Sequence, residues 1–317
     1  MQGFIVRRLL SAGVVVTLVS VLVFIMMHLL PGDALVVKLG ETGRIPAERM
    51  ADLRRQMGID APLPVQYVRW VGQVLDGSLG HSLIYEGQTV RSRIVRALPV
   101  TVQFGLMAIL AALVIGVPLG VLSAVFQDRP LDYLVRVLAL TGLTLPSFWL
   151  GLIIIVFGTL YLGYKPPREY VRLLDDPARN LSMMWLPALI LGYSLAASVM
   201  RMTRSTVLEA LHEDYARTAR AKGLTARAVV VRHVLRNALI PVITLVGNQA
   251  AFVFSGALIL EILFGLPGMG QVTYLGITQR DYPQVQGNAL VIGSFVVLLN
   301  LVVDLSYGVV DPRIRYS

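Results

Sequence analysis

The polar residues best placed to do chemistry lie in one basic connection, residues 201–236, between two strongly apolar stretches. It holds eight Lys and Arg residues and three acidic residues. Because these charges border an apolar face, we expect this connection to bind a partner rather than to catalyse a reaction. Four residues form that face at helical spacing: Val207, Leu208, Leu211 and Tyr215. We predict an amphipathic helix from Thr206 to Gly223, suited to a groove on a partner whose movement it would transmit.

Two side-chain patterns support this helix. Thr206 and Glu209 have the spacing of a capping box, which would mark the start of the helix. Glu213 and Arg217 are four residues apart and are expected to pair, with Asp214 able to compete for the same guanidinium.

The glycine at position 223 is expected to end this helix. Thr225 would then cap a second helix over Ala226–Arg236, which leads into the next apolar stretch. Physical chemistry alone leaves an alternative open, because a connection with a net charge of +5 could simply bind anionic lipid headgroups.

Enzyme chemistry finds little support in the sequence. The chain has no Cys, no His-Glu-x-x-His or Gly-x-Ser-x-Gly motif, and no Gly-x-x-x-x-Gly-Lys-Ser/Thr phosphate loop. Gly268 and Gly270 lack the third glycine of a dinucleotide-binding loop. The histidines lie in separate segments without metal-ligand spacing: His28, His81, His212 and His233. We predict no catalytic and no metal-binding residues, and we expect His28 to pack at an interface.

The elements that position these residues must sit in a bilayer. Hydrophobic residues make up 56% of the 317 residues and charged residues only 15%, too little polar surface for a soluble domain. The net charge of +9 lies mainly in the breaks between apolar runs, so we expect no nucleic-acid partner. The absence of Cys excludes disulfides and leaves the redox compartment open.

Six runs without Asp, Glu, Lys or Arg are long enough for transmembrane helices, which need roughly 20 residues. They are 9–30, 97–127, 137–164, 180–200, 237–260 and 282–303. The first is too long for the core of a cleaved signal peptide, so we expect a retained anchor. The glycine-broken run 262–279 is expected to form an ordered loop or re-entrant turn. The predicted fold class is an all-α integral membrane protein with six transmembrane helices.

The distribution of charge predicts the orientation. Short segments on the side of the termini carry 14 Lys and Arg residues, and those on the opposite side carry five. The positive-inside rule therefore places both termini in the cytoplasm. Arg91, Arg93 and Arg96, next to the second span, count against this orientation. Glu261 and Asp304 near span ends could serve an ion-coupled carrier that works alone, a weaker alternative because water can reach both.

Three parts of the chain follow from this topology. Residues 1–30 form the N-terminal tail and first transmembrane anchor, and residues 97–317 form a five-helix core with the cytoplasmic loop 201–236. Residues 31–96 form a periplasmic segment with short helices, one over 46–58 and one from Pro64 towards Gly77. This segment is either a solvated cap or a contact surface for an external protein.

A passage through the membrane needs polar lining and helices that bend. Prolines in or at the ends of four spans permit bends: Pro99, Pro118, Pro146, Pro187 and Pro241. Polar residues within the spans are the candidate lining of a translocation pathway: Gln103, Asn248, Gln249 and Ser255. The equal alternative is that they form hydrogen bonds between helices.

The basic connection also carries a family signature. Residues 212–241, from His-Glu-Asp-Tyr-Ala-Arg to Ala-Leu-Ile-Pro, resemble the loop by which the first of the two permeases of peptide and nickel ABC importers engages its ATPase. Further matching pieces are Leu29 to Asp33, Leu145 to Trp149, Glu261 to Gly270, Arg280 to Pro283 and Asp311 to Tyr316, so that the likeness covers nearly the whole chain. The family loop has Glu and Ala where this chain has Arg217 and Thr218, so Asp214 is the acid that could take the place of that Glu.

The resemblance implies a type I ABC importer permease fold and a transporter of several chains. The expected partners are a second homologous permease subunit, two cytoplasmic ATPase subunits that bind ATP and Mg²⁺, a periplasmic substrate-binding protein and membrane lipid. No cofactor is expected on this chain. The residues expected to couple to the ATPases are Leu211, Asp214, Tyr215, Arg217, Thr218, Ala219, Lys222 and Gly223. The implied function is a non-enzymatic inner-membrane permease that forms half of the pathway for peptides or for related solutes such as nickel chelates, glutathione or sugars.

Overall fold

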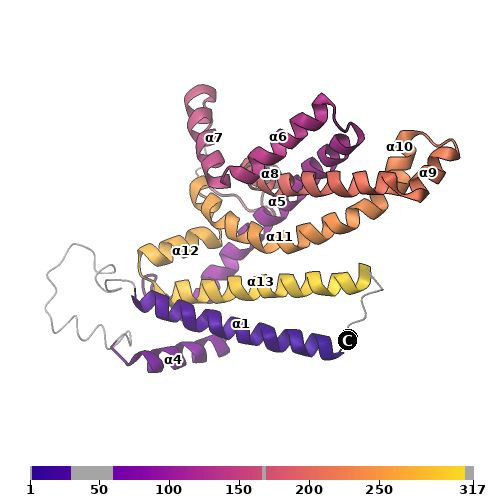
Figure 1. Cartoon of the computed structure of the whole chain (residues 1–317). Coiled ribbons are helices and arrows are strands. Elements are labelled where there is room, and N and C mark those ends of the chain that lie inside the picture. Colours follow the sequence, from indigo (N-terminus) through magenta and orange to yellow (C-terminus); the bar gives the residue numbers. More distant parts are fainter. Residues whose placement is uncertain (1, 30–59, 166–168, 311–317) are drawn as a thin grey trace. The chain divides into compact units, whose positions relative to one another are not determined.

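The computed structural model describes residues 2–29, 60–165 and 169–310, and within these ranges every regular element is a helix (Figure 1). Five helices are long and apolar enough to cross a membrane. They are α1 (Gln2–Leu29), α5 (Val90–Val125), α8 (Pro177–His212), α11 (Leu235–Phe264) and α13 (Tyr282–Val310). They coincide with five of the six predicted spans, which confirms the all-α membrane architecture.

The remaining predicted span, 137–164, needs a correction. The structure divides this run into α6 (Pro130–Thr144) and α7 (Ser147–Leu162), which meet at 101° and form a broken span or a re-entrant loop. The break lies at Leu145, whose backbone is extended at φ −84° and ψ 122°. Because the following Pro146 disfavours the helical conformation at Leu145, one apolar run forms two helices.

A second break follows α11. Gly265 adopts a left-handed φ of +67° and ends that helix after Phe264. The short helix α12 (Met269–Thr278) comes next, so the segment 262–279 is ordered and partly helical, where we predicted an ordered loop or a re-entrant turn.

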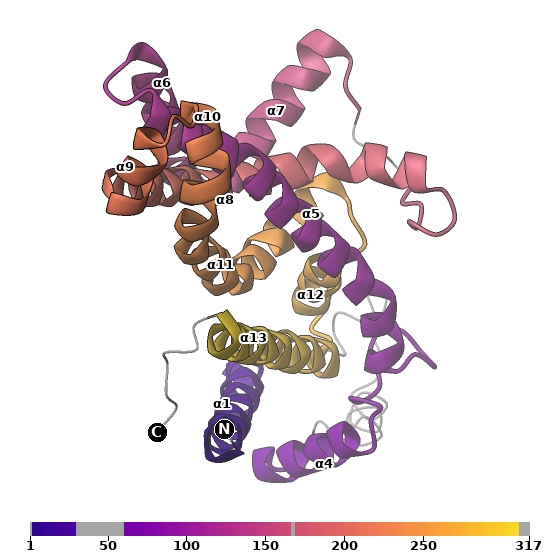
Figure 2. The same cartoon turned by 90° about the vertical axis from the view of Figure 1, so that its right-hand side faces the viewer.

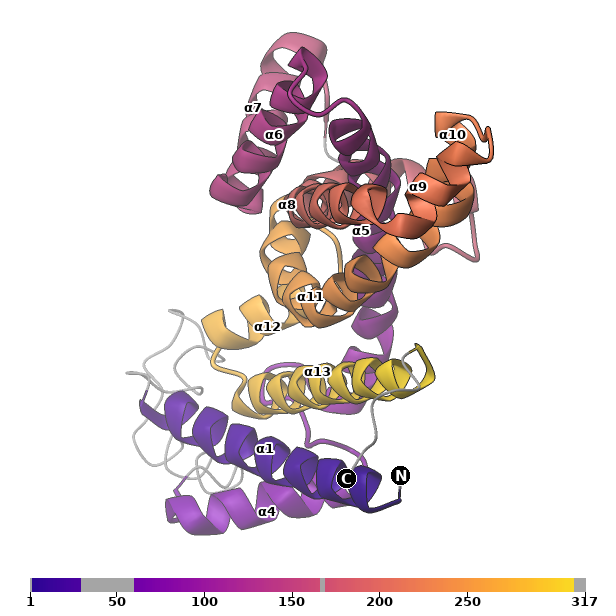
Figure 3. The same cartoon turned by 45° about the vertical axis from the view of Figure 1, so that its right-hand side comes forward.

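The described helices belong to two compact units, one formed by residues up to Val100 together with Pro267–Leu301 and the other by Thr101–Leu266. In the first unit α1 lies between α4 (Leu63–Leu75) and α13 (Figure 1, Figure 3). The helix α4 confirms the prediction from Pro64, whereas the predicted helix over 46–58 lies outside the described residues.

The contacts of α1 with its two neighbours centre on His28. Its Nε2 atom lies 3.1 Å from Oε1 of Gln66 on α4, and its ring centroid lies 5.4 Å from that of Tyr282 on α13. Ser20 and Tyr67 join their hydroxyl groups at 2.8 Å. His28 therefore packs between helices, as its position in the sequence suggested.

A buried ion pair fixes the loop between α4 and α5 to the start of α13. The carboxylate of Asp281 is fully buried and accepts hydrogen bonds from the hydroxyl of Ser82, from the backbone N–H of Leu83 at 3.0 Å and from Nη1 of Arg93 at 3.5 Å. The Arg93 guanidinium also lies 3.9 Å from the ring centroid of Tyr85. Arg93, which counted against the predicted orientation, is thus neutralised within the fold.

In the second unit α8 packs against α6 and α11, and close contact with α5 depends on two glycines. A Cβ atom at Gly116 would lie 2.7 Å from Cβ of Val199, and one at Gly120 would lie 2.6 Å from Cβ of Thr203. The spacing of four residues places both glycines on one face of α5, so the backbones of α5 and α8 approach as in other small-residue membrane helix pairs.

Candidate functional site

The structure places the predicted docking helix at the end of α8, but as two elements. The helix α8 continues to His212, Glu213 is extended at φ −68° and ψ 152°, and a separate helix α9 (Asp214–Ala221) follows (Figure 2). The prediction of one helix from Thr206 to Gly223 is therefore wrong. The predicted docking segment instead contains the separate eight-residue helix α9, joined to α8 through a single extended residue.

The predicted capping box is also absent. Thr206 lies inside α8, where its hydroxyl donates to the carbonyl of Met202 at 3.1 Å, and Glu209 accepts a hydrogen bond from the hydroxyl of Ser205. A capping box satisfies the free N–H groups at the start of a helix. Because α8 begins about eight turns earlier, at Pro177, the N–H groups near Thr206 already have helical partners.

Small residues fix α9 to the rest of the unit. Ala216 and Ala219 are buried in a cluster with the ends of α5, α8 and α11. Its other buried members are Ala124, Val207, Ala210, Val229, Val234 and Ala238, and Leu208 and Leu211 pack against it. Alanine side chains let the helices approach closely. The helix α9 is therefore packed against the ends of three long helices.

The outer face of α9 carries charge. Asp214 and Arg217 form an ion pair at 3.6 Å in place of the expected Glu213–Arg217 pair, and their side chains are 96% and 69% exposed. An ion pair this exposed contributes little to stability, so both groups are open to a partner. Thr218 is exposed as well, with its hydroxyl donating to the carbonyl of Asp214 at 2.9 Å, and Tyr215 is 37% exposed beside them.

A glycine turn closes α9. Gly223 has a left-handed φ of +82°, its N–H donates to the carbonyl of Arg220 at 2.9 Å, and the N–H of Leu224 donates to the carbonyl of Ala219 at 3.3 Å. The exposed Lys222 precedes the glycine. Nη2 of Arg220 reaches back to the carbonyl of Leu211 at 3.2 Å and so connects the end of α9 to the end of α8.

The second predicted helix begins as expected. The hydroxyl of Thr225 accepts a hydrogen bond from the N–H of Ala228, which confirms the cap of α10 (Ala226–Val229). The sequence analysis missed the following π-helix η1 (Val230–Val234), through which the chain enters α11. A π-helical segment holds one more residue per turn than an α-helix and marks an adjustable point in a helix.

An ion pair that the sequence analysis missed braces the same ends of the helices. Asp132 on α6 is fully buried and accepts from Nε and Nη2 of Arg204 on α8 at 2.8 and 2.9 Å. It also accepts from the hydroxyl of Ser123 on α5 and from the N–H of Asp128 at 3.1 Å. The carboxylate thus connects three helices, so a movement of α8 carries α6 with it.

The four candidate pathway residues lie in different settings. Gln103 donates its amide to Asn180 and so joins α5 to α8, which is the expected alternative of a hydrogen bond between helices. Asn248 is exposed on α11, and Gln249 lines a pocket of about 250 Å³. Ser255 lies on α11, but its side chain lies outside the described residues.

The described part of the chain holds no group of three or more His, Cys, Asp or Glu residues that could bind a metal ion. The site consists of the charged helix α9, which is joined to α8 by the extended residue Glu213 and is packed through its alanines against the ends of α5, α8 and α11.

Comparison with known proteins identifies the family of the chain. The family model described as the binding-protein-dependent transport system inner membrane component matches residues 116–316. A second model, for the N-terminal part of the membrane component of binding-protein-dependent transport systems, matches residues 1–105.

Individual proteins agree with these matches. A putative peptide permease of Brucella suis is 39% identical, with 98% of each chain covered, and the dipeptide transport system permease protein DppB of Escherichia coli is 38% identical over the whole of both chains. The solved structure of the MetNI methionine ABC transporter in inward-facing conformations has a TM-score of 0.52 at 20% identity, covering 69% of this chain and 96% of that one. This likeness confirms the predicted permease fold. The chain therefore belongs to the family of binding-protein-dependent transport system inner membrane components, the multi-pass permease subunits of ABC importers.

Proposed function

We propose that this chain is the permease subunit of a peptide importer, with α9 as the helix through which ATPase subunits drive it. The assignment of peptides as cargo is supported by the names of two relatives, a putative peptide permease and a dipeptide transport permease, each covered over nearly its whole length. The complete transporter would contain a second homologous permease, two cytoplasmic ATPases and a periplasmic binding protein. ATP and Mg²⁺ would bind to the ATPases and not to this chain.

One observation carries the role of α9. Its exposed face presents Asp214, Tyr215, Arg217 and Thr218, while its alanine face is packed against the ends of α5, α8 and α11. A helix that only stabilised the fold would not need so many exposed polar groups, and a helix that only bound a partner would not need the buried side. The combination suits an element that receives a force and passes it on.

The orientation belongs to the same proposal. With both termini in the cytoplasm, α9 and its glycine turn lie in the cytoplasm, and residues 31–96 lie in the periplasm. The core over 97–317 then forms half of the pathway. ATPase closure would move α9 and shift the permease pair between inward-facing and outward-facing states, a population shift driven by the nucleotide state.

Reconstitution tests the proposal. The chain, purified with its partner subunits and placed in vesicles with the binding protein, should take up a labelled dipeptide only when ATP is supplied. Vesicles that contain this chain alone should show no uptake. Uptake by the isolated chain, or ATP-dependent uptake that no peptide competes with, would contradict the proposal.

A further inference from the structure

A polar stripe runs along one face of α8. Ser194, Ser198, Arg201 and Ser205 follow one another at intervals of four, three and four residues, which places them on one side of the helix. Their exposure increases along the chain, since both Ser194 and Ser198 are half-buried and both Arg201 and Ser205 are exposed. The stripe therefore opens towards the end of α8 that continues into α9.

Two hollows follow this stripe. One, of about 250 Å³, is lined by Ser194, Ser198 and Gln249 of α11, and the other, of about 350 Å³, is lined by Arg201 and Ser205. Leu143 of α6 lines both, so the two hollows adjoin. We refer to the two hollows together as the groove; its lining includes Ser194, Ser198, Arg201 and Ser205 of α8.

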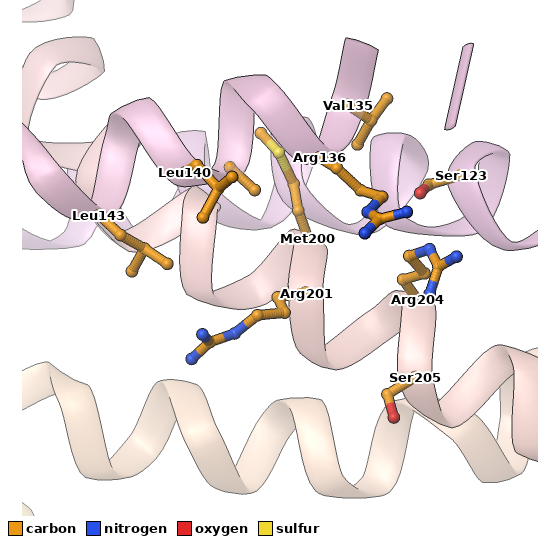
Figure 4. A pocket seen from close by; sticks show the side chains of 10 residues that line it. Ser123, Val135, Arg136, Leu140, Leu143, Met200, Arg201, Arg204 and Ser205 are labelled. Atoms are coloured by element: carbon orange, nitrogen blue, oxygen red, sulfur yellow. The ribbon is translucent and has the colours of Figure 1, made fainter. Parts of the chain in front are cut away.

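Three of the polar residues that line the groove have no hydrogen-bond or ion-pair partner within the described part of the chain, whereas the hydroxyl of Ser205 donates to Glu209. Neither Ser194, Ser198 nor Arg201 forms a hydrogen bond or an ion pair there, in contrast to Arg204, which binds Asp132 through two nitrogen atoms. Figure 4 shows the Arg201 side chain directed away from Arg136 and Arg204, towards the end of the pocket where Leu143 lies. Because the Arg201 side chain is exposed and unpaired in the described part of the chain, its guanidinium is accessible to a charged ligand.

We propose that this groove is the part of the cargo route formed by this subunit, and that Arg201 binds the terminal carboxylate of the peptide as it passes. The inference rests on the proposed function in peptide import. A guanidinium group matches a carboxylate with two parallel hydrogen bonds. The hydroxyls of Ser194 and Ser198 and the amide of Gln249 can exchange hydrogen bonds with the peptide backbone, which every peptide presents regardless of its side chains.

Cysteine accessibility tests the groove, and the natural absence of Cys from this chain makes the experiment direct. Ser194→Cys, Ser198→Cys and Ser205→Cys are introduced singly into the assembled transporter, whose partner chains are freed of Cys. Leu189→Cys is the control, because Leu189 is 36% exposed on a different face of α8. A charged, membrane-impermeant thiol reagent added from the cytoplasmic side should label the groove positions about tenfold faster than the control, since only a thiol in water ionises readily.

A dipeptide substrate should slow this labelling at position 198. Labelling no faster than at Leu189→Cys, or spontaneous cross-links from positions 194 and 198 to the second permease without any labelling, would show a helix-packing face and overturn the proposal.

The role of Arg201 has its own test. Uptake of a dipeptide with a free terminal carboxylate is compared with uptake of the same dipeptide carrying a terminal amide, and the ratio is measured in the wild type and in Arg201→Gln. The binding protein's own preference for one of the two dipeptides is the same in the wild type and in Arg201→Gln, so it cancels when the two ratios are compared. We expect Arg201→Gln to reduce the preference for the free carboxylate about tenfold, because a charge-assisted hydrogen bond is lost. Arg201→Lys should retain most of it.

Arg136→Gln is the matched control, since Arg136 lines the same pocket but is directed towards Arg204 (Figure 4). An unchanged ratio in Arg201→Gln, or an equal change in Arg136→Gln, would overturn the role of Arg201. Failure of the wild-type transporter to take up either dipeptide would instead overturn the proposed function, so the two failures are distinguishable.

Discussion

The sharpest prediction concerns Gly223, the residue that ends α9. Its φ of +82° lies in the left-handed region, and a Cβ atom placed there would meet no atom within 4 Å. The cost of Gly223→Ala is therefore backbone strain alone, about 1–2 kcal/mol. This cost is too small to unfold a domain, yet it shifts the balance between the left-handed turn and other conformations of residue 223 about tenfold.

The expected result is partial uncoupling. The number of peptides transported per ATP hydrolysed should fall in the order wild type, Gly223→Asn, Gly223→Ala, Gly223→Val, since Asn tolerates the left-handed region and a β-branched side chain does not. The assay measures dipeptide uptake and phosphate release in the same vesicles. The amount of protein in the membrane should stay near that of the wild type.

Gly163→Ala provides the matched control. Gly163 ends α7 with a φ of +65°, and a Cβ atom added to it would likewise meet no atom within 4 Å, so the substitution should cause the same strain at a distance from α9. It should leave transport per ATP unchanged. Wild-type coupling in Gly223→Val, or an equal loss in Gly163→Ala, would refute the reasoning.

Three further predictions concern the scaffold. Asp132→Asn leaves the 24% exposed Arg204 without its carboxylate and should destabilise the purified transporter by about 1–3 kcal/mol, measured as a lower Tm, whereas an unchanged Tm would show that the brace is not structural. Asp281→Asn should release the loop that contains Ser82 and speed its proteolysis; equal cleavage rates would contradict the role of the buried pair. Gly120→Leu should prevent stable accumulation in the membrane, because even a Cβ atom there lies 2.6 Å from Cβ of Thr203. A Cβ atom at Gly13 meets no atom within 4 Å, so Gly13→Leu should accumulate normally. Equal amounts of the two variants would contradict close α5–α8 packing.

The long apolar helices were predictable because membrane insertion depends on a sum over about 20 residues, which a sequence shows directly. The cap of α10 was predictable for a similar reason, since Thr225 and the N–H group that it binds are three residues apart. Local chemistry of this kind needs no knowledge of the fold.

Features that depend on distant residues were not predictable in this way. The apolar spacing from Val207 to Tyr215 continues through Glu213 without interruption, and the chain departs from the helix there as Ala216 and Ala219 enter a cluster formed by other helices. The brace between Asp132 and Arg204 joins residues 72 positions apart. At Pro146 the sequence indicates a bend, but the angle of 101° is set by packing.

The candidate site likewise contains features that the sequence predicts and features that it does not. The sequence predicts the location of the proposed docking segment, its closing glycine and the charged Asp214 and Arg217. The sequence does not predict which acid pairs with Arg217, because Glu213 and Asp214 are both within reach of it. In the structure α9 begins at Asp214, and the pair forms with Asp214. The stripe on α8 was missed because its serines are common in packed membrane helices, and the structure alone shows that they line a hollow.

The most direct measurement of the central claim is a cross-link from α9. Arg217→Cys gives the chain a single thiol on the exposed face, and a short thiol-to-amine cross-linker is added to the assembled transporter in membranes. We predict a covalent product with an ATPase subunit, and none from Leu174→Cys, which is 94% exposed between α7 and α8. Absence of the ATPase product from Arg217→Cys, or labelling of that thiol by an impermeant reagent added outside intact cells, would contradict the account.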